Sequence, residues 1–304
     1  MDAPLYPNDL KNWEFDKEAP QNFCQRQVAV LIDTTRALDK KSEAMPTRSK
    51  TNFSNYLGVN KLTSLQHPMV KHLVKLREKK EYRRLCNSAL ISGTKLIKEL
   101  AFSHRFKTVF IENNYIPAFT IDAECIFSVH PSILKKVTAL VQPEPIAAEI
   151  SLPQEADLQH ADYLLILDGV SDPGNMGTLL RTALALGFNA VLITPASADP
   201  FNEKALRAAK GATFTLPIKQ AAWEEIDILL NSKRWDICAA DAKGTLMQEI
   251  KCTPPIALVL GNESQGISTR VKTLAKSIAI PMQREMESLN VASAGAILMQ
   301  FLRK

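Results

Sequence analysis

The sequence lacks several features that mark common classes of protein. No apolar stretch among its 304 residues approaches the ~20 needed to span a bilayer. The N-terminal segment carries acids and no apolar core, so it resembles neither a secretory signal nor a good transit peptide. The five cysteines are scattered without a C-x-x-C pair, which argues against a zinc site and favours a reducing compartment. We therefore expect a cytoplasmic protein with no membrane segment and no metal.

The usual nucleotide-binding motifs are also missing. The chain has no G-x-x-x-x-G-K-[ST], and neither "GNMG" (174–177) nor "GNESQG" (261–266) fits G-x-G-x-x-G. These absences argue against a P-loop and against a dinucleotide-binding Rossmann site. All five histidines lie outside the polar loops of the second half, so the sequence indicates neither a metal cluster nor a Ser-His catalytic pair there.

Positive charge is concentrated in one region of the chain. Residues 61–107 hold twelve basic and three acidic side chains, a local net charge of +9, whereas the whole chain carries +5. A region this basic beside a nearly neutral remainder predicts a surface that binds a polyanion. The side chains that we expect there are Lys71, Lys75, Arg77, Lys79, Lys80, Arg83 and Arg84.

Composition and periodicity divide the chain into four parts. Residues 1–58 form a polar tail, with one short element around 27–32, and residues 59–148 a small basic α/β domain. Residues 149–161 close a stretch rich in proline and acids that is typical of a linker. In 162–304 short apolar strands alternate with helices, which predicts a mostly parallel sheet covered on both faces.

Three loops rich in small polar residues follow predicted strands in the second half: 168–178, 261–268 and 281–290. Ligands of open parallel sheets bind beyond the carboxyl ends of the strands, so these loops are the candidate site. Its charged groups include Arg181 and Glu263. An arginine stays protonated and cannot serve as an ordinary base, but it can pair with a phosphate or stabilise an oxyanion. Such a site suits transfer of an already activated group, for example a sulfonium methyl, to a nucleic-acid ribose.

The same loops carry three ordered motifs: "DPGNMGTLLRTA", "LVLGNESQG", and "IPM" followed by "SLNVASA". Together they resemble the SpoU (TrmH-type) family of RNA ribose 2′-O-methyltransferases in the SPOUT superfamily. The segment "NEKALRAAKGATFTLPI", which contains Arg207, is similar to the connecting part of that family. The basic domain, beginning "LTSLQHPMVKHLVKL", resembles the substrate-binding domain often found before the catalytic one. The resemblance covers most of residues 60–304.

The resemblance implies a fold, a cofactor and a set of site residues. The fold would be a C-terminal SPOUT α/β domain with a deep trefoil knot, an exception to the rule that chains avoid threading. S-adenosylmethionine would contact the backbone near Gly261, Ile280 and Leu289. The partners would be RNA, ribosomal RNA ahead of transfer RNA, and a second copy of the chain in a homodimer. The catalytic residues would be Arg181, Asn175, Glu263, Ser288 and Asn290, and Arg207 would join the RNA-binding residues.

Two departures from the family pattern leave alternatives open. Arg284 stands where the family usually has glycine, which puts the geometry of that loop in doubt, and Lys210 replaces a small residue. One alternative is an RNA-binding protein that kept the fold without catalysis, and another is an enzyme that methylates a base instead of ribose. The sequence names neither the RNA nor the nucleotide.

Overall fold

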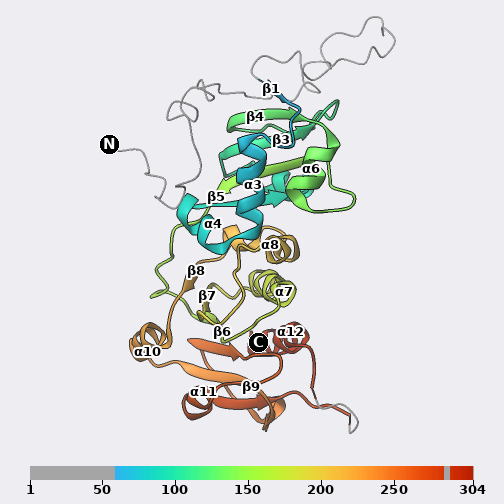
Figure 1. Ribbon diagram of the computed structural model, residues 1–304. Helices are drawn as coiled ribbons and strands as arrows, with labels where there is room; N and C mark the ends of the chain where they lie inside the picture. Colours follow the sequence, from blue (N-terminus) through green and yellow to red (C-terminus); the bar gives the residue numbers. More distant parts are fainter. Residues whose placement is uncertain (1–58, 284–287, 304) are drawn as a thin grey trace, which may run out of the picture. The chain divides into compact units, whose positions relative to one another are not determined.

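A computed structural model describes residues 59–283 and 288–303, and the chain divides into two compact units between Leu152 and Pro153. The predicted N-terminal tail, the short element around 27–32 and Arg284 lie outside the described residues. Each unit is built around its own sheet (Figure 1).

The described part of the first unit, residues 59–152, is an α/β domain with a mixed sheet in the order β1-β4-β3-β5-β2. Neighbours β1, β4 and β3 run parallel, whereas β5 is antiparallel to both β3 and β2. The strands are β1 (Val59–Leu62), β2 (Ser88–Ser92), β3 (Phe106–Glu112), β4 (Ala123–Val129) and β5 (Ile146–Ser151). The helices are α3 (Pro68–Glu78), α4 (Lys80–Cys86), α5 (Thr94–Leu100) and α6 (Pro131–Thr138).

Strand β5 corrects one prediction from the sequence. The linker predicted at 149–161 overlaps a strand, because Ile146–Ser151 pair with β3 on one side and with β2 on the other. The apolar residues of β5 are Ile, Ala, Ala and Ile, a run too short to stand out from the prolines beside it. Strands β1 and β4 were also absent from the prediction. Long-range pairing within the sheet, rather than local pattern, is what makes these segments strands.

Helix α3 shows why the basic segment folds as it does. Val70, Leu73 and Leu76 recur every three residues, and all three are fully buried in a cluster with α6 and the sheet. His67 accepts the main-chain N–H of Met69 at the start of the helix, where Pro68 fits because its missing N–H is not needed. Lys71 and Lys75 lie outside this buried set and stay partly exposed.

The second unit, residues 153–303 with a gap at 284–287, has a parallel sheet in the order β11-β9-β10-β6-β7-β8. Its strands are β6 (Tyr163–Leu167), β7 (Ala190–Ile193), β8 (Ile218–Gln220), β9 (Asp236–Leu246), β10 (Ile256–Leu260) and β11 (Lys276–Ala279). Its helices are α7 (Pro173–Ala185), α8 (Glu203–Ala209), α9 (Ala212–Thr215), α10 (Trp223–Asn231), η3 (Met247–Glu249), α11 (Thr269–Leu274) and α12 (Val291–Leu302). The segment "TFTLPI" (213–218) is typical of a strand, but its first three residues belong to α9 and only Ile218 belongs to β8.

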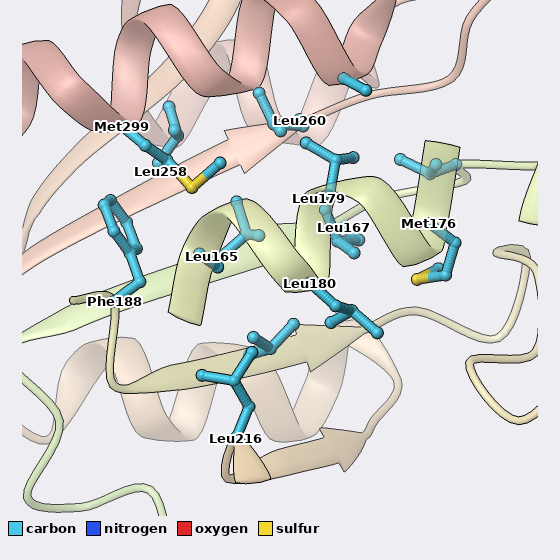
Figure 2. Packing of buried hydrophobic residues seen from close by; sticks show 14 of the residues in the cluster. Leu165, Leu167, Met176, Leu179, Leu180, Phe188, Leu216, Leu258, Leu260 and Met299 are labelled. Atoms are coloured by element: carbon cyan, nitrogen blue, oxygen red, sulfur yellow. The ribbon is translucent and has the colours of Figure 1, made fainter. Parts of the chain in front are cut away.

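Helices cover both faces of this sheet, because its central strands are apolar on both sides. In β6, Leu165 and Leu167 belong to the cluster formed with α7 and α12, whereas Leu164 and Ile166 belong to the cluster formed with α10 and α11. This alternation is the period of two of an extended strand. Figure 2 shows residues of the first cluster, with Leu179 of α7 among them. The predicted parallel sheet between two helical layers is confirmed.

Glycine allows α7 to lie unusually close to α8. A Cβ added at Gly177 would stand 2.1 Å from the carbonyl oxygen of Ala205 in α8 and 2.7 Å from the Cβ of Ala208. Since no side chain fits there, the sequence of α7 fixes its distance from α8. The trefoil knot stays a prediction. Within the described ranges, no helix combines the length and apolar character that crossing a bilayer needs.

Candidate active site

The candidate site lies at the carboxyl ends of the neighbouring parallel strands β6 and β10. Strands β6 and β10 pair in register, with Leu167 opposite Leu260, so the loops that follow them emerge side by side. One loop leads into α7 and the other contains Glu263. The chain after β11 leads into α12, which packs against α7. The strand order therefore brings together the first two predicted loops and the start of α12.

Glu263 joins two of these loops through its carboxylate. Oε2 accepts the main-chain N–H and the hydroxyl of Ser171, at 3.1 and 2.9 Å. Oε1 accepts the main-chain N–H of Asp172 at 3.2 Å and the side-chain amide of Asn175 at 3.1 Å. A carboxylate offers about four lone-pair positions, and four donors occupy them here. Glu263 thus holds the loop after β6 in place, with its acceptor capacity taken up by the protein.

The same contacts decide the protonation state of Glu263. Partial burial would raise its pKa, but the amide of Asn175 and the main-chain N–H groups of Ser171, Glu263 itself and Asp172 outweigh burial and lower the pKa to about 2. Glu263 is therefore ionised at every pH at which an enzyme ordinarily works. It has neither a proton to donate nor the basicity expected of a general base.

We call Glu263 and its donors Ser171, Asp172 and Asn175 the clamp. Asn175 connects this clamp to α12. Its amide nitrogen donates to Glu263, and its Oδ1 accepts from Nδ2 of Asn290 at 3.0 Å. The Oδ1 of Asn290 in turn accepts the first main-chain N–H groups of α12, from Ala292 and Ser293. Asn290 is thus the N-cap of α12 and a partner of Asn175 at once. Three of the five predicted catalytic residues, Asn175, Glu263 and Asn290, form one continuous hydrogen-bonded chain.

Two further residues hold the clamp together, and the sequence did not assign them. Asn262 donates from Nδ2 to the carbonyl oxygen of Gly169 at 2.8 Å, and its Oδ1 accepts from the main chain of Ser264 and Gln265. Asp172 is the N-cap of α7, where Oδ1 accepts the N–H of Asn175 at 2.8 Å. The aspartate before Pro173 is a recognisable start signal for a helix, and this signal could have identified Asp172.

Arg181 and Ser288 lie apart from that chain. Arg181 is six residues beyond Asn175 on α7, about 9 Å along the helix axis. Its side chain is exposed, and the described residues include no hydrogen-bond or ion-pair partner for it. Ser288 is exposed as well and begins the described segment after the gap. The structure therefore places Arg181 on the helix that the clamp positions, with its guanidinium available to a ligand.

The residues expected at the cofactor follow the carboxyl ends of two strands. Gly261 comes directly after β10 and Ile280 directly after β11, and Leu289 precedes the cap of α12 with 37% of its surface exposed. A Cβ at Gly261 would lie 2.3 Å from the carbonyl oxygen of Gly266, so only glycine permits this turn. Main-chain groups beside partly exposed apolar side chains suit an adenosine ligand bearing a sulfonium.

The basic residues of the first unit serve two different purposes. Arg83 is 3% exposed, and its guanidinium donates to the carbonyl oxygens of Leu76 and Arg77. Arg77 donates to the carbonyl oxygens of Lys136 and Val137 at the end of α6. These two arginines hold helices together, so we leave them out of the proposed RNA surface. The other expected basic residues are at least partly exposed and are kept in the proposed RNA surface: Lys71, Lys75, Lys79, Lys80 and Arg84.

Arg207, expected at the RNA from the resemblance, lies on α8. It forms an ion pair with Glu203 one turn earlier, and partial burial lowers its pKa. The neighbouring Lys204 pairs with Asp172 at 2.7 Å, which ties α8 to the start of α7. Helix α8 therefore contacts the site through Lys204, which pairs with the N-cap of α7. The charge of Arg207 is neutralised by Glu203 of the same helix.

Comparisons with known proteins agree with this geometry. The profile of the SpoU rRNA Methylase family matches residues 162–300, and that of an MRM3-like substrate binding domain matches residues 67–148. The 23S rRNA (guanosine(2553)-2'-O)-methyltransferase RlmP of Bacillus subtilis is 33% identical over 249 residues, which are 81% of this chain and 100% of the relative. The 23S rRNA (guanosine-2'-O-)-methyltransferase RlmB of Photorhabdus laumondii is 29% identical, with 77% and 96% covered.

Solved structures share the fold along most of the chain. The AdoMet-bound rRNA methyltransferase of Sinorhizobium meliloti superposes with a TM-score of 0.71 at 25% identity, covering 81% of this chain and 97% of the other. An RNA methyltransferase of the TrmH family from Porphyromonas gingivalis gives a TM-score of 0.69 at 29% identity, with 79% and 98% covered. The resemblance predicted from the three motifs is confirmed, and the chain belongs to the SpoU family of rRNA methylases.

Proposed function

We propose that this protein transfers a methyl group from S-adenosylmethionine to a ribose 2′-OH of ribosomal RNA. The observation that carries the proposal is the hydrogen-bonded chain Glu263–Asn175–Asn290, which fixes α7 and α12 at the carboxyl edge of the sheet. Relatives named for guanosine 2′-O-methylation of 23S rRNA support the reaction and the class of RNA. An AdoMet-bound relative of the same fold supports the cofactor.

In this proposal the protein itself supplies position and charge. S-adenosylmethionine, when bound, supplies a methyl group already activated on a sulfonium. Gly261, Ile280 and Leu289 hold it through the main chain, since they line the ends of β10 and β11 and the start of α12. Glu263 keeps the loop before α7 in one conformation, because its four acceptor positions are filled by Ser171 and Asp172 of that loop and by Asn175 in the first turn of α7. Preorganisation of this kind removes the reorientation that water would require.

Arg181 is the residue to which we assign the reacting hydroxyl. A guanidinium remains protonated, so it stabilises the developing ribose oxyanion or the neighbouring phosphate without exchanging a proton. Its exposure on α7 leaves this charge free to meet RNA. Asn175 contacts the RNA beside it, and Ser288 and Asn290 complete the pocket from the start of α12.

The proposed partners follow from surfaces on the two units. Partly exposed lysines of α3 and α4, with the exposed Lys79 between these helices, offer phosphate contacts for structured RNA, and we place ribosomal RNA ahead of transfer RNA. Leu184 of α7 and Ile297 of α12 are each 38% exposed on helices that pack together, which supports a homodimer through this surface. We place this protein in the cytoplasm, as expected for a protein that acts on ribosomal RNA.

The decisive experiment separates cofactor binding from turnover. We expect Arg181→Ala to bind S-adenosylmethionine in calorimetry as the wild type does, while transfer of radiolabel to ribosomal RNA falls by about 10²–10³. Arg234→Ala is the matched control, because Arg234 is an exposed arginine of the same unit, without an ion-pair partner among the described residues. Full activity in Arg181→Ala would refute the role of this residue.

Two results would contradict the proposed function and favour another one. RNA binding without any calorimetric signal from S-adenosylmethionine would indicate a non-catalytic RNA-binding protein. A labelled product that alkaline hydrolysis still cleaves at the modified nucleotide would indicate methylation of a base, because a methylated 2′-OH blocks that cleavage.

A further inference from the structure

Two cysteines that the proposed reaction does not use lie in contact. The sulfur atoms of Cys238 and Cys252 are 3.1 Å apart, although the residues are separated by 14 positions in the chain. Cys238 is fully buried in β9, and Cys252 is partly buried in the segment that joins η3 to β10. Both are free thiols. A disulfide has a sulfur–sulfur bond of 2.03–2.05 Å, so bond formation requires the two atoms to approach by only about 1 Å.

Contacts that do not involve sulfur hold the two segments in this position. Thr253, the neighbour of Cys252, donates from its main-chain N–H to Oδ2 of Asp236 at 2.8 Å and from its hydroxyl to the same atom at 3.3 Å. Asp236 and Cys238 are two residues apart in one strand and so point to the same side of the sheet. Lys276 of β11 donates to Oδ1 of Asp236 at 2.6 Å. The segment after η3 is thus fastened beside β9, which sets Cys252 opposite Cys238.

We propose that Cys238 and Cys252 form a reversible disulfide when the protein meets a peroxide, which makes the pair a redox modification site. The Cys252 thiolate attacks one peroxide oxygen, so a sulfur–oxygen bond forms, the oxygen–oxygen bond breaks, and one water leaves after protonation. The Cys238 sulfur then displaces the hydroxyl from the sulfenic acid and releases its own proton, giving the disulfide and a second water. The two thiols lose two electrons, and the peroxide gains them.

The surroundings of the pair assign the attacking sulfur to Cys252. Cys252 has the more accessible side chain, and Cys238 lies among the apolar residues beneath it. A hydrogen bond from the Cys238 thiol lowers the pKa of Cys252, and the nearby Lys276 ammonium acts in the same direction. The thiol of Cys238 has a raised pKa because it donates this hydrogen bond and is buried. The thiolate, which is the reactive form, therefore develops on the residue that a peroxide can reach.

The disulfide would close a loop that borders the candidate site. Met247 and Ile250 lie within that loop and pack against the same apolar cluster as Ile280, which we place at the cofactor. A disulfide between residues 14 positions apart reduces the conformational entropy of the unfolded chain. We therefore expect the oxidised protein to resist unfolding more than the reduced protein, and its segment between β9 and β10 to open less often.

Peptide mapping of the full-length chain tests the proposal directly. The wild type is treated with hydrogen peroxide, its remaining thiols are alkylated, and it is digested with trypsin without reduction. We expect peptide 235–243 joined to peptide 252–270, two hydrogens lighter than their sum, and separated again by dithiothreitol. Peptide 85–95, with the partly exposed thiol of Cys86, is the internal control and is expected to remain alkylated.

Two variants keep the test decisive if one of them folds poorly. In Cys252→Ser or Cys238→Ser the joined peptide cannot form, and peroxide treatment should leave the unfolding temperature unchanged. In the wild type that temperature should rise by on the order of 5 °C and return on reduction. Alkylation of both Cys238 and Cys252 after peroxide, at the level seen for Cys86, would overturn the proposal. None of these measurements depends on methyl transfer, so the result stands apart from the proposed function.

Discussion

Replacing Glu263 by glutamine tests whether its carboxylate holds the loop before α7. Four donors point at the two oxygens, from Ser171 (N–H and hydroxyl), Asp172 and Asn175. A glutamine keeps one oxygen and presents an NH₂ group in place of the other. Two of the four donors then face a donor, and the charge that strengthens the remaining bonds is gone. We expect Glu263→Gln to fold with a less stable second unit.

The size of the effect follows from the pKa of Glu263. A fall from its ordinary 4.5 to about 2 corresponds to at most about 3 kcal/mol of preference for the ionised form in the folded state. Because the side chain is exposed, solvent screening reduces this limit to about 1–2 kcal/mol. For a unit of this size the unfolding temperature should fall by roughly 2–8 °C at pH 7.

The dependence on pH has a definite direction. Because the pKa of Glu263 is lower in the folded state, its contribution is complete above pH 4.5 and declines as the pH falls toward 2. The gap between wild type and Glu263→Gln should therefore be constant from pH 5 to 8 and narrow below pH 4.5. Urea unfolding followed by circular dichroism measures it.

Glu249→Gln is the matched control. Glu249 is an exposed glutamate of the same unit and has no hydrogen-bond or ion-pair partner among the described residues. Its replacement should leave the unfolding midpoint unchanged. Equal stability of Glu263→Gln and the wild type at pH 7, or a gap of the same size at pH 3, would show that the carboxylate is not a clamp.

Substitutions at three further positions probe other parts of the molecule. Gly177→Ala should lower the free energy of unfolding by about 1–3 kcal/mol in urea titration, because the new methyl group meets the carbonyl of Ala205; an unchanged midpoint would contradict the close packing. Asn290→Ala should lose about 1 kcal/mol of stability together with activity. Asn290→Asp should restore the cap and the stability but not the methyl transfer, since it cannot donate to Asn175; equal recovery of both would refute this division. Lys79→Ala should leave urea unfolding unchanged and reduce by about one the slope of RNA affinity against salt, with an unaltered slope counting against a phosphate contact.

Local pattern was sufficient for much of the second unit. The apolar run "IALVL" forms β10, and the polar residues after Asp168 lead from β6 into α7, although α7 begins at Pro173, within the loop predicted at 168–178. Apolar runs and start signals of helices act over a few residues, so the sequence alone reports them. The ordered motifs likewise identified the family and the candidate catalytic residues, including Asn175, Glu263 and Asn290.

The tertiary structure decided what those residues do. The contact between Glu263 and Asn175 spans 88 positions and exists because β10 lies beside β6, a strand order that periodicity does not encode. In the same way, the basic pattern of the first unit did not distinguish Arg83, which is buried against carbonyl groups, from the exposed Lys79. Sequence determines which chemical groups are present and the local elements that carry them. Packing of distant segments determines which of those groups are already satisfied by the protein and which remain free for a ligand.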